Sequence, residues 1–282
     1  MSGRRGQRAA RLPAPGRAPT PAALLAALGI ALTLAALLAA PTAAETVQQE
    51  GIRLSFRGAL EPRALPRSRP APVRISLRAG IGGADGQPLP QLRHLSIAIN
   101  RLGRLDAAGL PVCRFDQVQP ASTAAALAAC GGSLVGTGRF AASVKITEQV
   151  PYPSRGRIVA FNGRYHGRPA ILLHVYGTAP TPASYTLPLT IGRARGDFGI
   201  VLRTSVARTT PSAGRVTALS LRLGRTYSFH GRRRSYLSAS CPAPRDSRFA
   251  SFPFVRARLG FADRSLALTV RRSCGVSEPG SG

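Results

Sequence analysis

Short segments in which apolar and polar residues alternate dominate the chain after its first fifty residues. In residues 215–223, Leu219, Leu221 and Leu223 alternate with Ser220 and Arg222, so one face is apolar. A period of two predicts a half-buried strand. Such segments, separated by Gly, Pro and Asn-Gly, lie at 52–57, 72–78, 95–100, 143–147, 157–162, 170–176, 185–191, 199–205, 215–223, 226–230, 254–261 and 266–270. They predict an all-β fold, an antiparallel β-sandwich of jelly-roll or Greek-key type.

One segment has a helical pattern instead. Residues 121–130 read Ala-Ser-Thr-Ala-Ala-Ala-Leu-Ala-Ala-Cys, and Gly131-Gly132 follows. Ser122 or Thr123 is a suitable N-cap, the alanines favour helix, and the glycines end it. We expect one short helix near 122–130, which a disulfide at Cys130 would link to the rest of the fold.

Prolines set the domain organisation that we expect. Residues 59–71 contain three prolines, which exclude a central strand or a helix. We assign 45–71 to an extended N-terminal segment and 72–282 to a single β-sandwich domain, because no repeat or natural linker divides the latter.

The first 44 residues have the order of an export signal. Five arginines without an acid precede a mostly apolar run at 21–40, and Pro41-Thr42-Ala43-Ala44 follows. This is a charged region, an apolar region and a small-residue cleavage site. Two outcomes stay open: cleavage after Ala44, or retention of 21–40 as a single membrane anchor. Either outcome places the remaining chain outside the cytoplasm, secreted or tethered to the cell membrane.

The chain is strongly basic. Its formal charge is +28, or +23 without the five arginines of residues 1–44, and Lys145 is the only lysine. Such a charge attracts anionic envelope polymers, lipid headgroups or nucleic acid. The dominance of arginine, with abundant Ala, Gly and Pro, also fits the codon bias of a GC-rich genome, so the charge alone does not identify a partner.

Four cysteines, all after residue 44, indicate disulfides in an exported chain: Cys113, Cys130, Cys241 and Cys274. Three connectivities are possible, and sequential pairing is the most economical because each bond closes a local loop. A zinc site is not expected, because no C-x-x-C or H-x-x-x-H spacing occurs. No cofactor is expected either, since the G-x-G-x-x-A match at 136–141 continues into a strand instead of opening a helix.

Several short motifs resemble a recurrent group of uncharacterised exported proteins of high-GC actinobacteria. They are Leu110-Pro111-Val112-Cys113, Ala126-Leu127-Ala128-Ala129-Cys130-Gly131, Ser133-Leu134-Val135-Gly136, Ala160-Phe161-Asn162-Gly163, Gly167-Arg168-Pro169-Ala170-Ile171, and Arg234-Ser235-Tyr236-Leu237-Ser238-Ala239 before Cys241-Pro242. The similarity covers roughly residues 90–274. It implies a shared fold and carries no activity, ligand or catalytic residue to this chain.

Signatures of hydrolytic chemistry are weak. The nucleophile elbow G-x-S-x-G is absent. His166, His174 and His230 are the candidates for a site assembled in space, although turns and strand faces explain each of them. Glycosidase chemistry needs two positioned carboxylates, and the few acids lie mostly in turn-like contexts.

The strongest local candidate for anion binding is the run Arg232-Arg233-Arg234, followed by Tyr236. Arginines interleaved with aromatic residues can hold phosphate and stack bases, and a solvated hairpin turn explains the same pattern. We therefore expect an exported, non-enzymatic binding or structural protein of the cell envelope or extracellular space. The alternatives are an exported hydrolase with a histidine site, and binding of anionic polymers or nucleic acid through arginine-rich loops.

Overall fold

The computed structural model describes residues 45–84, 86–119, 122–145, 150–206 and 214–277. In chain order its strands are β1 (Glu45–Gln49), β2 (Ile52–Glu61), β3 (Ala64–Leu65), β4 (Ala71–Pro72), β5 (Arg74–Gly83), β6 (His94–Asn100), β7 (Gly103–Leu105), β8 (Cys113–Arg114), β9 (Leu134–Val144), β10 (Tyr152–Tyr165), β11 (Arg168–Gly177), β12 (Ala183–Arg193), β13 (Phe198–Ser205), β14 (Gly214–Leu223), β15 (Thr226–Phe229), β16 (Arg232–Ser235), β17 (Leu237–Ala239), β18 (Phe249–Gly260) and β19 (Ser265–Val276). The helical segments are η1 (Phe115–Val118), α2 (Thr123–Cys130) and η2 (Gly131–Ser133).

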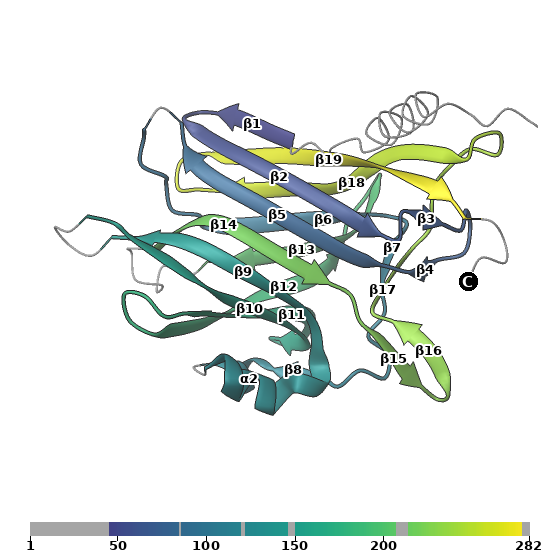
Figure 1. Cartoon of the computed structure of the whole chain (residues 1–282), viewed down its shortest axis with the longest axis horizontal. Coiled ribbons are helices and arrows are strands. Elements are labelled where there is room, and N and C mark those ends of the chain that lie inside the picture. Colours follow the sequence, from purple (N-terminus) through teal and green to yellow (C-terminus); the bar gives the residue numbers. More distant parts are fainter. Residues whose placement is uncertain (1–44, 85, 120–121, 146–149, 207–213, 278–282) are drawn as a thin grey trace, which may run out of the picture. The chain divides into compact units, whose positions relative to one another are not determined.

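Most of these strands belong to one curled sheet (Figure 1). Its order is β1-β2-β5-β14-β9-β10-β11-β12-β13-β6-β18-β19-β3, and β8 pairs with β10. Neighbours run antiparallel, except that β3 is parallel to β19 and β8 is parallel to β10. The alternation of each strand turns its apolar residues to the inner face, where they form the main core cluster.

The curl brings the two ends of the strand order together. Arg272 of β19 pairs with Glu45 of β1 at 2.9 Å, and its Nε donates to the carbonyl oxygen of Gly58 in β2. The backbone amide of Arg271 also donates to Glu45. Side-chain contacts therefore join β1 to β19, although these two strands do not pair through their backbones.

The prediction of a mostly β fold with one short disulfide-linked helix is confirmed. The arrangement of the strands differs from the predicted sandwich. One continuous sheet forms both walls, in place of two separate sheets. Alternation of apolar and polar residues with a period of two indicates only that one face of a strand is buried. Both a curled sheet and a sandwich bury one face of each strand. Residues 45–61 also belong to the sheet, as β1 and β2, and not to an extended N-terminal segment; of these residues, the alternation predicts only 52–57 as strand.

A small second sheet lies where several strands of the large sheet end. Its order is β4-β17-β7. Leu237 of β17 and the wholly buried Tyr236 belong to the same core cluster as Leu60 and Ile99, near the ends of β2 and β6. The second disulfide, Cys241–Cys274, lies in this cluster as well. This end of the curled sheet is therefore filled by side chains.

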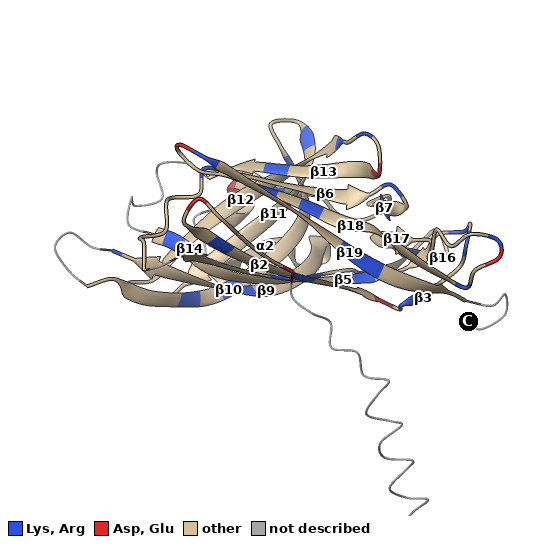
Figure 2. Ribbon diagram, turned by 90° about the horizontal axis from the view of Figure 1, so that it is seen from above, with Lys and Arg blue, Asp and Glu red and all other residues tan. Residues whose placement is uncertain are grey.

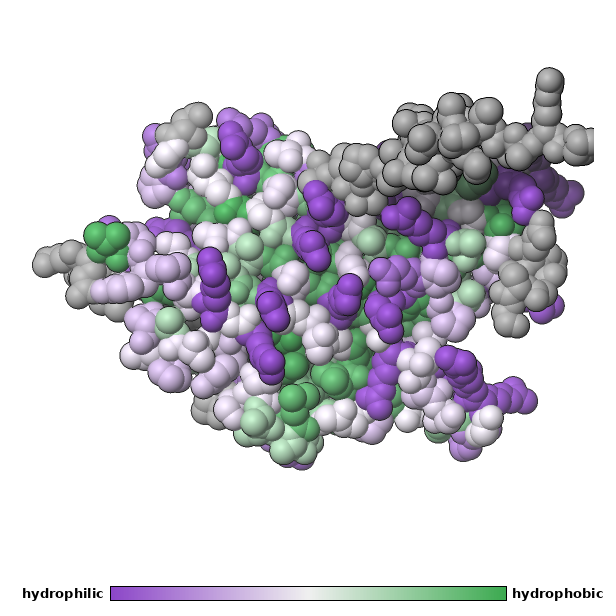
Figure 3. Space-filling model, viewed as in Figure 1, coloured by the Kyte–Doolittle hydropathy of each residue, from purple (hydrophilic) through white to green (hydrophobic). Residues whose placement is uncertain are grey.

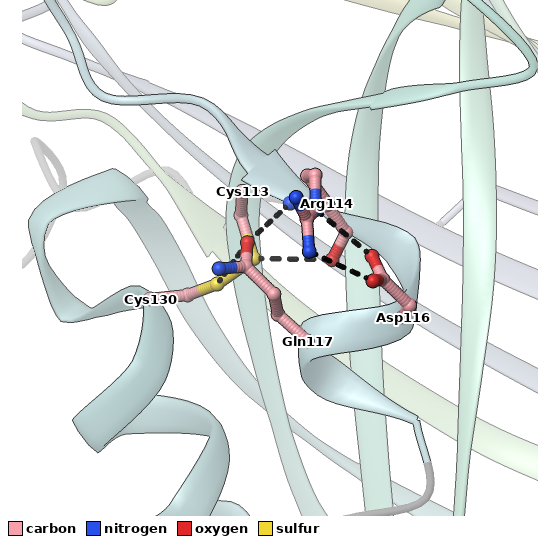
Figure 4. A network of polar contacts seen from close by, with 5 residues as sticks. All are labelled: Cys113, Arg114, Asp116, Gln117 and Cys130. Carbon is pink, nitrogen blue, oxygen red and sulfur yellow. Dashed lines mark hydrogen bonds and ion pairs between the residues drawn. A yellow bond between two sulfur atoms is a disulfide. The ribbon is translucent and has the colours of Figure 1, made fainter.

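The disulfide Cys113–Cys130 fastens a helical segment onto the outer face of β10 and β11 (Figure 4). Ser122 caps α2, because its Oγ accepts from the amide of Ala125 at 3.2 Å. Below the helix, Ala126 packs with Phe161 and Leu172 of the sheet. Both cysteine pairings follow the sequential order that we favoured from the sequence.

The disulfides bear on the cellular location of the chain. Two disulfides indicate an oxidising, extracytoplasmic environment. Among the described residues no helix is both long and apolar enough to span a bilayer. Residues 1–44, where the sequence predicts an export signal with an apolar run at 21–40 and a cleavage site after Ala44, lie outside the described residues.

Candidate ligand-binding cavity

The inner face of the curled sheet surrounds a cavity of about 380 Å³. Its walls are almost wholly apolar and come from both halves of the sheet, including Leu54, Phe140, Leu173 and Leu259. The volume lies within the ~300–1,000 Å³ that is usual for small-molecule sites. A molecule that fills this space must present mostly hydrocarbon to its walls, because buried polar groups without partners are unfavourable.

Glycines shape one wall of the cavity. Gly156 of β10 pairs with Gly177 of β11. A Cβ on Gly156 would lie 1.9 Å from the carbonyl oxygen of Tyr176 and 2.6 Å from the ring of Phe140. Because neither glycine has a side chain, the Phe140 ring occupies this position and becomes part of the lining.

The sheet is incompletely paired between β12 and β13. These strands pair at four positions only, from Thr190↔Arg203 to Arg193↔Ile200. Residues 183–189 of β12 pair with β11 on their other side and have no ladder partner in β13. Among the described residues, the edge of β12 that faces β13 is therefore unpaired over more than half of its length. We call this unpaired stretch the β12–β13 gap.

An outer groove of about 1,150 Å³ lies over the β12–β13 gap. One side of the groove is formed by Phe115, Gln119 and Tyr165, and the other by the outer faces of β13, β6 and β18. Six residues line both the groove and the inner cavity: Leu95, Ala183, Tyr185, Leu187, Thr204 and Leu259. The groove and the inner cavity therefore adjoin each other at the gap.

Two hydroxyl groups lie at this connection. Thr204 is only 7% exposed, and its Oγ1 has no hydrogen-bond partner within the described part of the chain. Burial raises the pKa of the Tyr185 phenol, which keeps this side chain a neutral hydrogen-bond donor. A buried hydroxyl without a partner is uncommon in folded proteins, and Thr204 is placed where a ligand atom could supply one.

Positive charge lines the groove beside the gap. Arg203 of β13 pairs across the sheet with Ser96 of β6, and Ser96 pairs in turn with Arg258 of β18. Both arginines are exposed and make no ion pair with any described carboxylate. Figure 2 shows basic positions on β13 and β18, and the sequences of β13, β6 and β18 contain no Asp or Glu. The groove therefore offers two guanidinium groups without an ion-pair partner among the described residues, on the two strands that flank β6.

The basic cluster predicted from the sequence does not form one anion site. Arg232 and Arg233 are exposed on β16, whereas Arg234 pairs with Asp106 at 2.8 Å and lies over the ring of Phe229 at 5.5 Å. Tyr236 is wholly buried, and this burial raises the pKa of its phenol. Its ring therefore cannot stack on an external ligand. The run of arginines indicated that these four residues share one surface. In the structure Arg232 and Arg233 face solvent, Arg234 is held by Asp106, and Tyr236 lies in the core.

The three candidate histidines lie on separate elements. His166 and His230 occupy the tight turns β10–β11 and β15–β16, both with positive φ. His174 is completely buried on β11, where its Nδ1 lies 3.1 Å from the carbonyl oxygen of Val118, and desolvation lowers its pKa. No hydrogen bond or ion pair links any of the three to a described carboxylate. Within the described ranges no cluster of His, Cys, Asp or Glu could hold a metal ion.

Sequence analysis missed the residues of the gap and the groove. Thr204 is a polar residue at an inward position of β13, two residues after the buried Leu202. That break in the apolar face was visible in the sequence. The alignment of Arg203 with Ser96 and Arg258 was not, because it depends on the pairing of strands far apart in the chain.

The fold and the cavity together have the form of a β-rich container with an apolar interior and a lateral opening. No family model matches the chain, and no curated protein or solved structure is significantly similar to it. The geometry of this chain alone therefore indicates what it can bind.

Proposed function

We propose that this chain is an exported, non-enzymatic binding protein that holds an apolar ligand inside its curled sheet. The observation that carries the proposal is the cavity of about 380 Å³, whose walls are almost wholly apolar. Transfer of hydrocarbon from water into such a space is favourable by roughly 25 cal/mol per Å² of buried apolar surface. A groove that opens into the interior gives the ligand access to it.

Export is supported by two disulfides and by the order of residues 1–44. Cleavage after Ala44 produces a free binding protein, and retention of 21–40 produces a tethered one. Sequencing the N-terminus of the protein recovered from the extracytoplasmic fraction distinguishes them: a terminus at Glu45 establishes the free form, and an uncleaved terminus in the membrane fraction establishes the tethered form.

A neutral fluorescent probe, N-phenyl-1-naphthylamine, tests the proposed function. The exported protein should bind it saturably with a blue-shifted emission. Ala142→Leu, which adds volume at a residue of the lining, should weaken binding by about tenfold, or ~1.4 kcal/mol. The matched control is Ala141→Leu, the next residue of β9, which is not part of the lining. It should bind as the unaltered chain does.

Thermal melting of each variant separates an altered cavity from an unfolded protein. If Ala142→Leu does not fold, Val216→Phe fills the lining from β14 and takes its place. Absence of saturable binding by the folded, unaltered protein overturns the proposal. Equal weakening by Ala142→Leu and Ala141→Leu also overturns it, because binding would then not take place in the cavity.

A row of arginines on the outer face favours a second function, binding of a linear polyphosphate-type anion. The cross-strand register aligns Arg57, Arg78, Ser220, Arg139 and Arg157 across β2, β5, β14, β9 and β10. All four arginines are exposed. Figure 3 shows hydrophilic side chains spread over this face. With ~4.8 Å between strands, the row extends over about 19 Å. The arginines lie on strands, and not on the loops where we expected them.

Salt dependence tests this second function with inorganic polyphosphate as the probe. Each phosphate contact contributes about 0.7–0.9 to the slope of log K against log salt concentration when the polyanion resembles a nucleic acid. Replacing all four arginines with glutamine should reduce the slope by about 3. A quadruple variant with an unchanged slope excludes the row, and equal binding to anionic vesicles would indicate a general charge effect.

A further inference from the structure

We propose that the ligand of the cavity is an anionic amphiphile with one hydrocarbon tail, which enters sideways through the β12–β13 gap and leaves its acidic head on Arg203 and Arg258. This inference rests on the proposed function and specifies the ligand class. A carboxylate and a phosphate head share the chemistry that the groove recognises, so the test includes both.

The tail reaches the interior through the side of the sheet. Residues 183–189 of β12 have no ladder partner toward β13, and Tyr185 and Leu187 line the cavity and the groove alike. A molecule lying across the gap can therefore bury one part inside and expose another part outside. This geometry suits a linear amphiphile better than a compact apolar molecule, which would be enclosed completely.

The hydroxyls of the gap mark the boundary between tail and head. Thr204 Oγ1 is buried without a partner, although it has both a donor and acceptor sites. An oxygen atom of the acidic head, at the point where the head joins the hydrocarbon tail, can accept from this group, and the Tyr185 phenol lies in the same part of the lining. A pure hydrocarbon would leave Thr204 without a partner.

The charges outside the gap select the sign of the head. Arg203, the residue before Thr204, lies on the opposite face of the strand, because successive residues of β13 point to opposite sides of the sheet. Arg203 and Arg258 flank Ser96 in the ladder, and no described acid lines the groove. A carboxylate or phosphate above Ser96 can accept charge-assisted hydrogen bonds from both guanidinium groups. A cationic head would meet only like charge.

Three single-tailed probes of equal chain length test the selectivity: palmitate, hexadecanol and hexadecyltrimethylammonium. We expect the protein to bind palmitate about tenfold more tightly than hexadecanol, and hexadecyltrimethylammonium most weakly. Palmitoyl lysophosphatidic acid distinguishes the two acidic heads, because binding at least as tight as that of palmitate indicates a phosphate site and weaker binding a carboxylate site. Each methylene removed from the palmitate tail should weaken binding by about fourfold, the equivalent of ~0.8 kcal/mol.

Arginine variants locate the head. Arg203→Gln with Arg258→Gln should weaken palmitate binding by about tenfold or more and leave hexadecanol binding within about twofold. The matched control is Arg139→Gln, which removes an exposed strand arginine from the outer row on β9, away from the groove. It should change neither affinity. All of these residues are exposed, so the variants are expected to fold, and melting checks this.

The outcomes separate this inference from the function on which it rests. If N-phenyl-1-naphthylamine does not bind, the cavity proposal itself fails. If the neutral probe binds but palmitate and hexadecanol bind equally, only the anionic ligand class is overturned. Equal losses for palmitate and hexadecanol in the double arginine variant likewise exclude Arg203 and Arg258 as the head site.

Discussion

Thr204→Val is expected to stabilise the empty protein and weaken its binding of ligand. Thr204 is 7% exposed, and its Oγ1 has no partner among the described residues. A buried hydroxyl without a hydrogen bond costs roughly 1–3 kcal/mol. Valine replaces the hydroxyl with a methyl group of similar size, so the free energy of unfolding should rise by about 1 kcal/mol. In a domain of this size that corresponds to a rise in Tm of about 2–4 °C.

The same substitution removes the donor that we assign to the ligand. A hydrogen bond to a charged head contributes about 1.5–3 kcal/mol, so the Kd for palmitate should rise by roughly tenfold or more. The assays are thermal unfolding of delipidated protein and titration with palmitate. A lower Tm together with an unchanged Kd would refute the reasoning, because Thr204 would then have an internal partner and no role in binding.

Thr190→Val is the matched control, because Thr190 lies where β12 pairs with β13. Thr190 lies on β12 opposite Arg203, and its Oγ1 donates to the carbonyl oxygen of Arg203 at 3.0 Å. Removing a hydroxyl that has a partner should leave Tm unchanged or lower it by a few degrees. Opposite shifts in the two variants would show that the absence of a partner causes the effect, and not the polarity of threonine as such.

Three further predictions concern stability, each measured by reversible chemical unfolding. Replacing Cys113 and Cys130 together with serine should lower the free energy of unfolding by about 3 kcal/mol, because the bond closes a loop with a sequence separation of 17; an unchanged midpoint would contradict this. Burial lowers the pKa of His174 below its unfolded value, so protonation favours the unfolded chain. The free energy of unfolding should therefore fall as pH decreases below about 6.5. His174→Gln should make this dependence on pH less steep, and an identical pH profile in the variant would exclude His174 as its cause. Glu45→Gln should lower the free energy of unfolding by about 1 kcal/mol, because it leaves the largely buried Arg272 without its counter-ion between β1 and β19. An equal decrease in high salt and in low salt would argue against an electrostatic cause.

The local structure was predictable because it depends on neighbouring residues. The alternation of Leu219, Leu221 and Leu223 predicts the buried face of β14, and Ser122 followed by an alanine-rich segment predicts α2 with its cap. Sequential disulfides followed from the same locality, since each bond closes a short loop. These inferences needed no knowledge of which strand lies next to which.

The arrangement of the strands was not predictable in this way. β14 pairs with β5, for example, so Leu221 lies beside Leu77 across more than a hundred residues of sequence. Residues 183–189 alternate like any paired strand, yet one of their two edges has no partner within the described part of the chain. Tyr236 also shows the limit of local patterns: the arginines before it suggested a surface, whereas its aromatic ring fills the core beneath the small sheet.

Three features of the cavity and its gap are unfavourable for the empty protein, and one ligand chemistry relieves all three. An apolar cavity lacks the contacts that a filled interior would have. Thr204 has a buried hydroxyl without a partner among the described residues, and Arg203 and Arg258 flank Ser96 without an ion pair to any described carboxylate. A hydrocarbon tail fills the cavity, an oxygen at its end accepts from Thr204, and an acidic head neutralises the arginines. A neutral apolar molecule addresses only the first feature and a polyanion only the last. The amphiphile is therefore the ligand class that accounts for all three features with a single site.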